Sequence, residues 1–157
     1  REIFLARYLK TEKVDIMTKK IVVDSSVIFK WLSKEKEARV EKALKLFTDG
    51  QKGKCQLYAP ILSKYEIGNG IWKRGLDLPK SKLLVETLYA IPINFIDLDE
   101  GMAKRGIEIA ILEKITFYDA SFIALAERLR AGLITDNPKH QKSTLKTNIK
   151  VVSLASY

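Results

Sequence analysis

The sequence predicts an α/β protein with a central, mostly parallel five-stranded sheet flanked by helices on both faces. Short runs of β-branched and aliphatic residues alternate along the chain with helical segments of about 10 to 15 residues. Strands separated by helices in this way pair in parallel, and right-handed crossovers place the helices over the sheet. The chain has 157 residues, of which 46% are hydrophobic, which is enough for one domain with its own core.

The N-terminal half is expected to contain two strands and three helices. The strands cover residues 20–24 and 56–59, and the helices cover residues 33–47, about 61–74 and 78–89. Asp49 with Gly50, and then Gly53, are expected to end the first helix. Pro60 closes the second strand and stands near the start of the next helix.

The C-terminal half is expected to contain three strands and two helices. The strands cover residues 92–96, 133–135 and 151–154, and the helices run up to residue 113 and from residue 119 to about 131. Asp97 or Asp99 is expected to cap the first of these helices. Gly132 is expected to terminate the second.

The composition favours a polyanionic partner. Lys and Arg number 28 against 19 acidic residues, so the formal net charge is +9, which attracts phosphate backbones over long range. The alternative is that the charge serves only solubility. The single cysteine, Cys55, cannot form an internal disulfide, and no apolar run approaches the roughly 20 residues that span a bilayer. We therefore expect a cytoplasmic protein without a membrane segment.

Two parts are expected along the chain: an N-terminal extension over residues 1–17 and a domain over residues 18–157. Met17 stands directly before the first strand and could be the biological start, with the preceding residues lying upstream of it. Apolar residues at helical spacing in this extension leave open that it packs against the domain or a neighbour.

Four acidic residues are candidates for one site. Asp24, Asp119 and Asp136 each stand at a strand end or a helix start on the same side of the predicted sheet, and Glu66 lies in a helix nearby. Carboxylates gathered in this way repel one another unless a divalent cation neutralises them. Oxygen ligands without a His or Cys cluster favour Mg²⁺ or Mn²⁺, so the pattern indicates a phosphoryl-transfer site.

Each acid also has a purely structural interpretation. Asp24 could cap the helix that follows it, and Asp119 could be the N-cap of its own helix. Glu66 could be a solvated helix residue. Asp136 and Asn137 stand before a proline, which is typical of a turn.

Three segments of the chain resemble PIN-domain proteins of the VapC toxin type. Residues 22–32 (VVDSSVIFKWL) resemble the opening of that family. Residues 62–70 (LSKYEIGNG) resemble its second-acid helix, and residues 116–127 (TFYDASFIALAE) with the strand at 133–135 resemble its third-acid helix and the strand after it. The order and spacing of the three agree, and the resemblance covers residues 20 to about 154.

The resemblance implies a PIN-like fold and a magnesium- or manganese-dependent endoribonuclease. Such a protein is typically a toxin that a partner antitoxin neutralises, and it forms a homodimer. The resemblance implies that Asp24, Glu66 and Asp119 are catalytic metal ligands, with Ser26 and Thr135 as hydroxyls near the metal or the phosphate.

The fourth acidic position departs from the family pattern. The family's fourth acid usually falls two residues after the strand-end threonine, where this chain has Asn137, whereas Asp136 comes one residue early. Either Asp136 substitutes through a shifted loop, or Asn137 serves as a neutral oxygen ligand.

Basic residues near these acids are expected to contact RNA. They are Lys30, Lys34, Lys73, Arg74, Lys139, His140 and Lys142. Trp31 or Tyr118 could stack on an unpaired base. The alternative is that the lysines form an ordinary solvated face, that His140 is a surface residue, and that Trp31 belongs to the core or to a dimer interface.

The leading functional hypothesis is the toxin endoribonuclease. One alternative is a catalytically weak PIN-like RNA-binding or regulatory module, which the missing acid at Asn137 favours. Another is a protein that acts chiefly as one half of an antitoxin complex.

Overall fold

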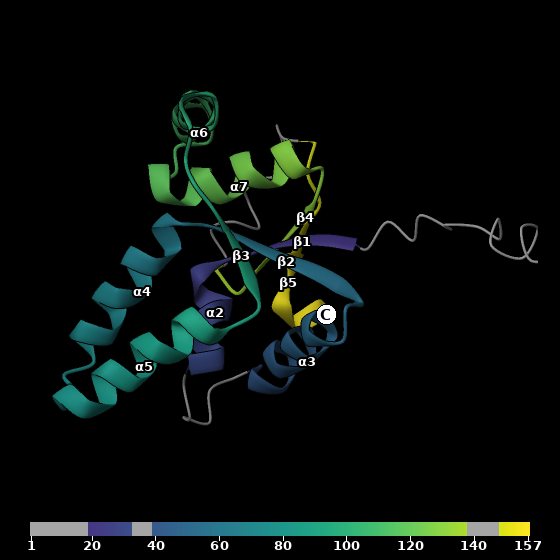
Figure 1. The fold of residues 1–157 in the computed structure, drawn as a ribbon. Coiled ribbons are helices and arrows are strands. Elements are labelled where there is room, and N and C mark those ends of the chain that lie inside the picture. Colours follow the sequence, from purple (N-terminus) through teal and green to yellow (C-terminus); the bar gives the residue numbers. More distant parts are fainter. Residues whose placement is uncertain (1–18, 33–38, 138–147) are drawn as a thin grey trace, which may run out of the picture.

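The computed structural model describes residues 19–32, 39–137 and 148–157 (Figure 1). The predicted sheet is confirmed: five parallel strands lie in the order β3-β2-β1-β4-β5. The strands are β1 (Lys19–Val23), β2 (Cys55–Pro60), β3 (Ile93–Ile96), β4 (Gly132–Thr135) and β5 (Val151–Ser153). The expected extension over residues 1–17 lies outside the described residues.

Helices cover both faces of this sheet, as predicted. The described residues form α2 (Ser25–Leu32), α3 (Val40–Gln51), α4 (Leu62–Lys73), α5 (Leu78–Ala90), α6 (Glu100–Glu113), α7 (Phe117–Leu129) and the short 3₁₀ helix η2 (Leu154–Ser156). Figure 1 shows α6 and α7 on one side of the sheet, with α2, α3 and α5 on the other.

The core forms on both faces because the side chains of a strand alternate between them. Ile21 and Val23 of β1 pack with residues of α2, α3 and α4 in one apolar cluster. Val22 packs with residues of α6 and α7 in the other. All three are fully buried, and burial of each side chain stabilises the fold by about 1.5 to 3 kcal/mol. Helices packed on both faces of the sheet therefore fix the positions of the strands.

Helix α3 continues through Asp49 and Gly50 to Gln51, with Lys52 as its C-cap. The predicted stop at Gly53 is confirmed, because Gly53 follows the cap in the left-handed conformation, with φ of 71°. The Asp49 carboxylate is buried inside the fold, where it accepts hydrogen bonds from Lys54 (3.0 Å), the Tyr157 hydroxyl (2.9 Å) and Lys45 (3.1 Å). A carboxylate that accepts from three side chains, two of them from outside α3, does not compete with the helix backbone. The same donors hold the pKa of Asp49 well below its usual range.

The boundaries of α7 also differ from the predicted ones. Its N-cap is Thr116, whose Oγ1 accepts the backbone N–H of Asp119 at 3.1 Å, so Asp119 is not the cap. The helix ends at Arg130 in the left-handed conformation, with φ of 51°. Gly132, the expected terminator, is instead the first residue of β4.

Candidate active site

The strand order places a ligand-binding crevice at the carboxyl end of β1. The chain passes from β1 outward through β2 and β3, and β4 and β5 lie on the other side of β1. Where the strand order reverses in this way, an open α/β sheet has its crevice. Asp24 follows β1 directly and Thr135 ends β4, and the pairing of Val23 with Ile134 brings the two side by side. The backbone N–H of Asp24 donates to the Ile134 carbonyl at 3.0 Å.

Two hydroxyls orient the Asp24 carboxylate. Its Oδ2 accepts hydrogen bonds from Thr135 Oγ1 at 2.5 Å and from Ser26 Oγ at 3.0 Å. Its backbone carbonyl accepts the N–H groups of Val27 and Ile28, so Asp24 opens α2 through its main chain. Asp24 therefore caps α2 through its backbone carbonyl, and its carboxylate accepts hydrogen bonds from hydroxyls of α2 and β4.

Glu66 is delivered from α4, which packs closely on α2. Ser25 Oγ donates to Glu66 Oε2 at 2.7 Å and so links the two helices. The helices approach closely at Gly70, where an added Cβ would overlap the ring of Phe29. A glycine is therefore required at this contact, and the contact keeps Glu66 near the carboxyl end of β1.

Asp119 comes from the first turn of α7. A carboxylate there is favoured by the partial positive charge of the helix N-terminus, by about 0.3 to 1 kcal/mol at an exposed site. The Thr116 cap sets where that turn begins and hence where Asp119 lies.

These three acids line one cavity of about 590 Å³. Its walls consist of Asp24, Ser25, Ser26, Phe29, Tyr65, Glu66, Asn69, Gly70, Lys73, Tyr118, Asp119 and Asn137. Within the described ranges, no three His, Cys, Asp or Glu side chains stand close enough together to form a ready-made metal cluster. The acids share a cavity without converging on one point, and the oxygen donors they offer suit a hard divalent cation.

The fourth candidate, Asp136, does not line this cavity. Its carboxylate pairs with Lys30 at 3.1 Å and with Arg39. Its backbone N–H donates to Ser26 Oγ at 3.1 Å. Asn137 lines the cavity in its place, and its N–H donates to Thr135 Oγ1 at 2.8 Å.

The basic and aromatic candidates fall into different environments. Lys30, expected to be exposed and to contact RNA, is instead buried because it pairs with Asp136. Trp31 belongs to the core, where its Nε1 donates to the Ala43 carbonyl at 2.6 Å. Tyr118 is 54% exposed at the cavity.

The other basic candidates lie on α4 or beyond the described ranges. Lys73 lines the cavity and is exposed. Arg74 is half-buried over the Phe29 ring, 5.4 Å from its centre. The remaining four candidates, Lys34, Lys139, His140 and Lys142, lie outside the described residues.

Sequence reasoning named Lys73 as an RNA contact but missed Asn69, which also lines the cavity. Asn69 and Lys73 follow Glu66 by three and seven residues on α4, a spacing that places all three on one helix face. That periodicity was available in the sequence. The contribution of Ser25 depends on how α2 and α4 pack, so no sequence pattern carries it.

Fold and cavity together define an α/β protein with an acid-lined pocket at the switch point of a parallel sheet. A family model described as "PIN domain" matches residues 21–144. The chain therefore belongs to the PIN-domain family, and its resemblance to the VapC-type ribonuclease toxins of that family is confirmed.

Relatives and solved structures agree with this assignment. The chain is 30% identical over 122 residues to "Ribonuclease VapC3" of Pyrobaculum aerophilum, which covers 74% of this chain and 88% of the relative. Its fold matches a toxin–antitoxin complex from Klebsiella pneumoniae with a TM-score of 0.63 at 19% identity, covering 85% of this chain and 97% of the other. It also matches VapC20 of Mycobacterium tuberculosis, a toxin that cleaves the sarcin–ricin loop, with a TM-score of 0.62 at 12% identity, covering 81% and 95%.

None of the described helices is both long enough and apolar enough to cross a bilayer.

Proposed function

We propose that this protein is an endoribonuclease that requires Mg²⁺ or Mn²⁺ and serves as the toxin of a toxin–antitoxin pair. The observation that carries the proposal is that Asp24, directly after β1, Glu66 of α4 and Asp119 of α7 line one cavity at the switch point of the sheet. Membership of the PIN-domain family and the similarity to a VapC ribonuclease support it.

In this proposal the cation is held by the carboxylates of Asp24, Glu66 and Asp119. When bound, it lowers the pKa of a water molecule and offsets charge on the phosphate that the water attacks. Ser26 and Thr135 fix the rotamer of Asp24, so that the carboxylate keeps one orientation. No side chain of the protein is needed as a nucleophile.

We assign the fourth corner of the site to Asn137 and not to Asp136. Asn137 lines the cavity and offers a neutral amide oxygen. Asp136 forms ion pairs with Lys30 and Arg39 outside the cavity. In this proposal those ion pairs fix the loop and so position Asn137. A neutral fourth ligand lowers the charge available for a second cation, so we propose that one ion binds much more tightly than any other.

The three carboxylates that line this cavity repel one another, and a bound cation would offset that repulsion. Addition of Mn²⁺ should therefore raise the melting temperature of the wild type, since a ligand that binds only the folded state stabilises it. Asp119→Asn should weaken this thermal shift, which reports on binding independently of activity.

RNA would reach the cavity past Lys73 and Tyr118. Lys73 supplies a cation for the phosphate backbone, and the exposed ring of Tyr118 offers a surface for an unpaired base. An antitoxin partner, a homodimer and a cytoplasmic setting belong to the same proposal, and toxin–antitoxin complexes among the structural neighbours support the first of these. We also retain residues 18–157 as the nuclease domain.

Cleavage of a single-stranded RNA in Mn²⁺ tests the proposal. Asp24→Asn and Asp119→Asn should each lower the rate by about 100-fold or more, since they remove a proposed cation ligand. The melting temperature of Asp119→Asn should stay level or rise, because relief of the repulsion between like charges offsets the lost attraction to the N-terminus of α7. Asp97→Asn is the matched control, because Asp97 follows β3 at the same edge but lies outside the cavity. Cleavage by Asp119→Asn at the wild-type rate would refute the site.

The second candidate function is a catalytically weak PIN-like RNA-binding or regulatory module. The neutral Asn137 at the fourth corner is the observation that favours it. Such a protein would bind RNA with a steep salt dependence and give no Mn²⁺-dependent heat in titration calorimetry. The ribonuclease proposal expects that heat.

A further inference from the structure

The edge of the sheet opposite the acid-lined cavity carries a row of cations. Lys19 and Lys20 open β1, and Lys150 directly precedes β5. Strand pairing sets these close together: Ile21 pairs with Gly132, and the N–H of Leu133 donates to the Lys150 carbonyl at 3.0 Å. β4 lies between β1 and β5, and neighbouring strands are about 4.8 Å apart, so the strands that carry these cations lie about 10 Å from each other.

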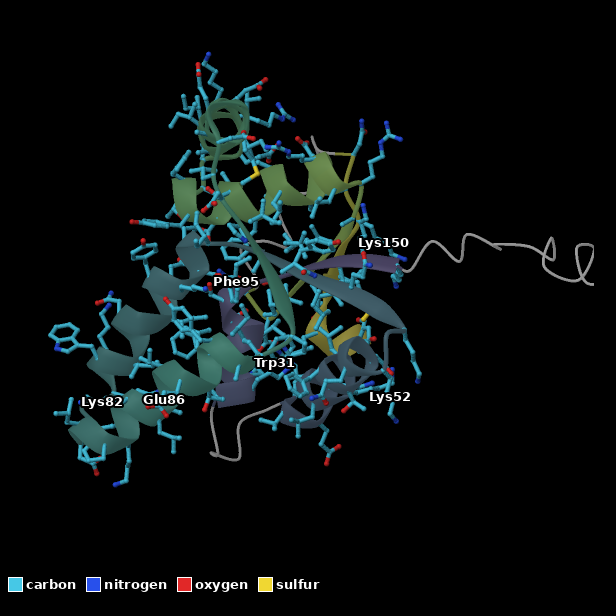
Figure 2. All side chains as sticks on the ribbon, viewed as in Figure 1. Trp31, Lys52, Lys82, Glu86, Phe95 and Lys150 are labelled. Carbon is cyan, nitrogen blue, oxygen red and sulfur yellow. The ribbon has the colours of Figure 1, made fainter. Side chains whose placement is uncertain are left out.

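The cations of this amino edge are exposed and largely uncompensated. They are Lys19, Lys20, Lys52, Arg130 and Lys150. Across the described part of the chain, none of these five forms an ion pair. Lys54, which precedes β2, differs because it pairs with Asp49 at 3.0 Å. Figure 2 shows Lys52 and Lys150 on the side of the molecule where β1 begins, away from α4 and α5.

A second cavity, of about 610 Å³, opens at this edge. Its walls consist of Arg105, Glu127, Arg130, Ala131, Gly132, Asn148, Ile149 and Lys150. Arg105 is neutralised by Glu127, whose carboxylate it contacts at 2.7 Å and 2.9 Å. Arg130 and Lys150 therefore give the cavity its net positive charge, and Asn148 adds amide hydrogen-bond donors.

We propose that the amino edge, made of these five cations and the cavity of Arg130 and Lys150, is a second RNA-binding surface that holds the duplex stem of a hairpin substrate. The proposal rests on the ribonuclease function argued above. The five residues of β1 separate the two edges by about 16 Å, at about 3.3 Å per residue. Cations at that distance cannot touch the nucleotide being cut.

A duplex stem fits this surface better than a single strand does. Double-stranded RNA is recognised through its phosphates and its shape, whereas a base that must enter a pocket has to be unpaired. The acid-lined cavity, with Tyr118 at its wall, suits the unpaired loop. The amino edge offers charge and donors, and none of the described residues that line its cavity is aromatic, which suits the paired stem.

The test compares two triple variants that each remove three positive charges. Lys20→Gln, Arg130→Gln and Lys150→Gln together neutralise the amino edge. The matched control replaces three exposed lysines of α5 and α6: Lys80, Lys82 and Lys104, each by Gln. Fluorescence anisotropy without divalent ions measures binding to a hairpin RNA whose stem is about one helical turn, and to the loop sequence alone as a single strand. Thermal melting first establishes that both variants fold.

The edge variant should bind the hairpin roughly tenfold more weakly than the control variant, with a salt slope lower by about 2, because each phosphate contact contributes about 0.7 to 0.9. Both variants should bind and cleave the single strand alike. Equal hairpin affinities and slopes for the two variants would overturn the proposal, as would an equal or larger loss for duplex DNA of the same length. Failure of the wild type to cleave the single strand in Mn²⁺ would instead refute the ribonuclease function, which separates the two outcomes.

Discussion

Replacing Thr135 by Val should separate the role of one hydroxyl from everything else at the site. The two side chains have nearly the same shape, and Thr135 is fully buried at the end of β4. Its Oγ1 donates to Asp24 Oδ2 and accepts the N–H of Asn137. The substitution therefore removes a donor from the proposed cation ligand and an acceptor from the loop that carries the fourth corner.

The expected cost follows from those two hydrogen bonds. A bond to a charged group contributes about 1.5 to 3 kcal/mol and a neutral one about 0.5 to 1.5 kcal/mol, so Thr135→Val should lower the free energy of unfolding by about 2 to 4 kcal/mol. For a chain of this size each kcal/mol lowers the melting temperature by about 2 to 4 °C. Loss of a hydrogen bond that orients a metal ligand typically weakens metal affinity about 10- to 100-fold.

Urea unfolding and Mn²⁺ titration calorimetry measure the two effects separately. Thr135→Ser should restore most of the Mn²⁺ affinity, because it keeps the hydroxyl. Thr87→Val is the matched control: its Oγ1 bonds the Leu83 carbonyl at 2.8 Å within α5, far from the cavity, so both quantities should stay near wild type. A Thr135→Val protein with the stability and Mn²⁺ affinity of Thr87→Val would refute the reasoning.

Three further outcomes follow from the same geometry. Gly70→Ala should destabilise the fold by about 1 to 3 kcal/mol in urea unfolding because its methyl overlaps a ring of α2, whereas Gly68→Ala, with open space at its Cβ, should be neutral or stabilising by up to about 1 kcal/mol. Asn137→Asp should raise the Mn²⁺ affinity measured by calorimetry, and Asp136→Asn should leave the ligand set intact; a larger loss of affinity in Asp136→Asn than in Asn137→Ala would reverse the assignment of the fourth corner. The lowered pKa of Asp49 contributes stability that is fully present above about pH 4, the pKa of the unfolded chain, and is lost as the pH falls toward the folded value. Asp49→Asn should therefore make the melting temperature fall less steeply with pH below about pH 4. An unchanged dependence would count against the hydrogen bonds of Asp49 as its cause.

The three acids that line the cavity were predictable as a group because each belongs to a local pattern. Asp24 ends an apolar strand, and Asp119 and Glu66 lie in helices with clear apolar spacing. The parallel sheet followed from the alternation of strands and helices, and its topology alone brings the ends of β1 and β4 together.

The fourth corner could not be predicted, because side-chain partners from other elements decide it. Asp136 is turned away by Lys30 of α2 and by Arg39, which is 97 residues distant in the sequence. Nothing in the local turn pattern distinguishes Asp136 from Asn137. The burial of Lys30 could not be predicted either, because a lysine on a helix is expected to be exposed unless its acidic partner is known.

Helix α2 was missed for a different reason. Five of its eight residues are buried, including Ser25 and Lys30, so the segment lacks the polar stripe by which an amphipathic helix is recognised. Their burial is explained by partners from other elements: Glu66 of α4 for Ser25 and Asp136 for Lys30.

The pairing of Asp24 with Thr135 also bears on how the protein is made. The two residues stand 111 positions apart, so a growing chain carries Asp24 long before it carries the hydroxyl that orients it. The ribosome must add β4 and Asn137 before the cavity has all its walls. In the ribonuclease proposed above, synthesis from the N-terminus therefore delays assembly of the site until most of the chain has been made.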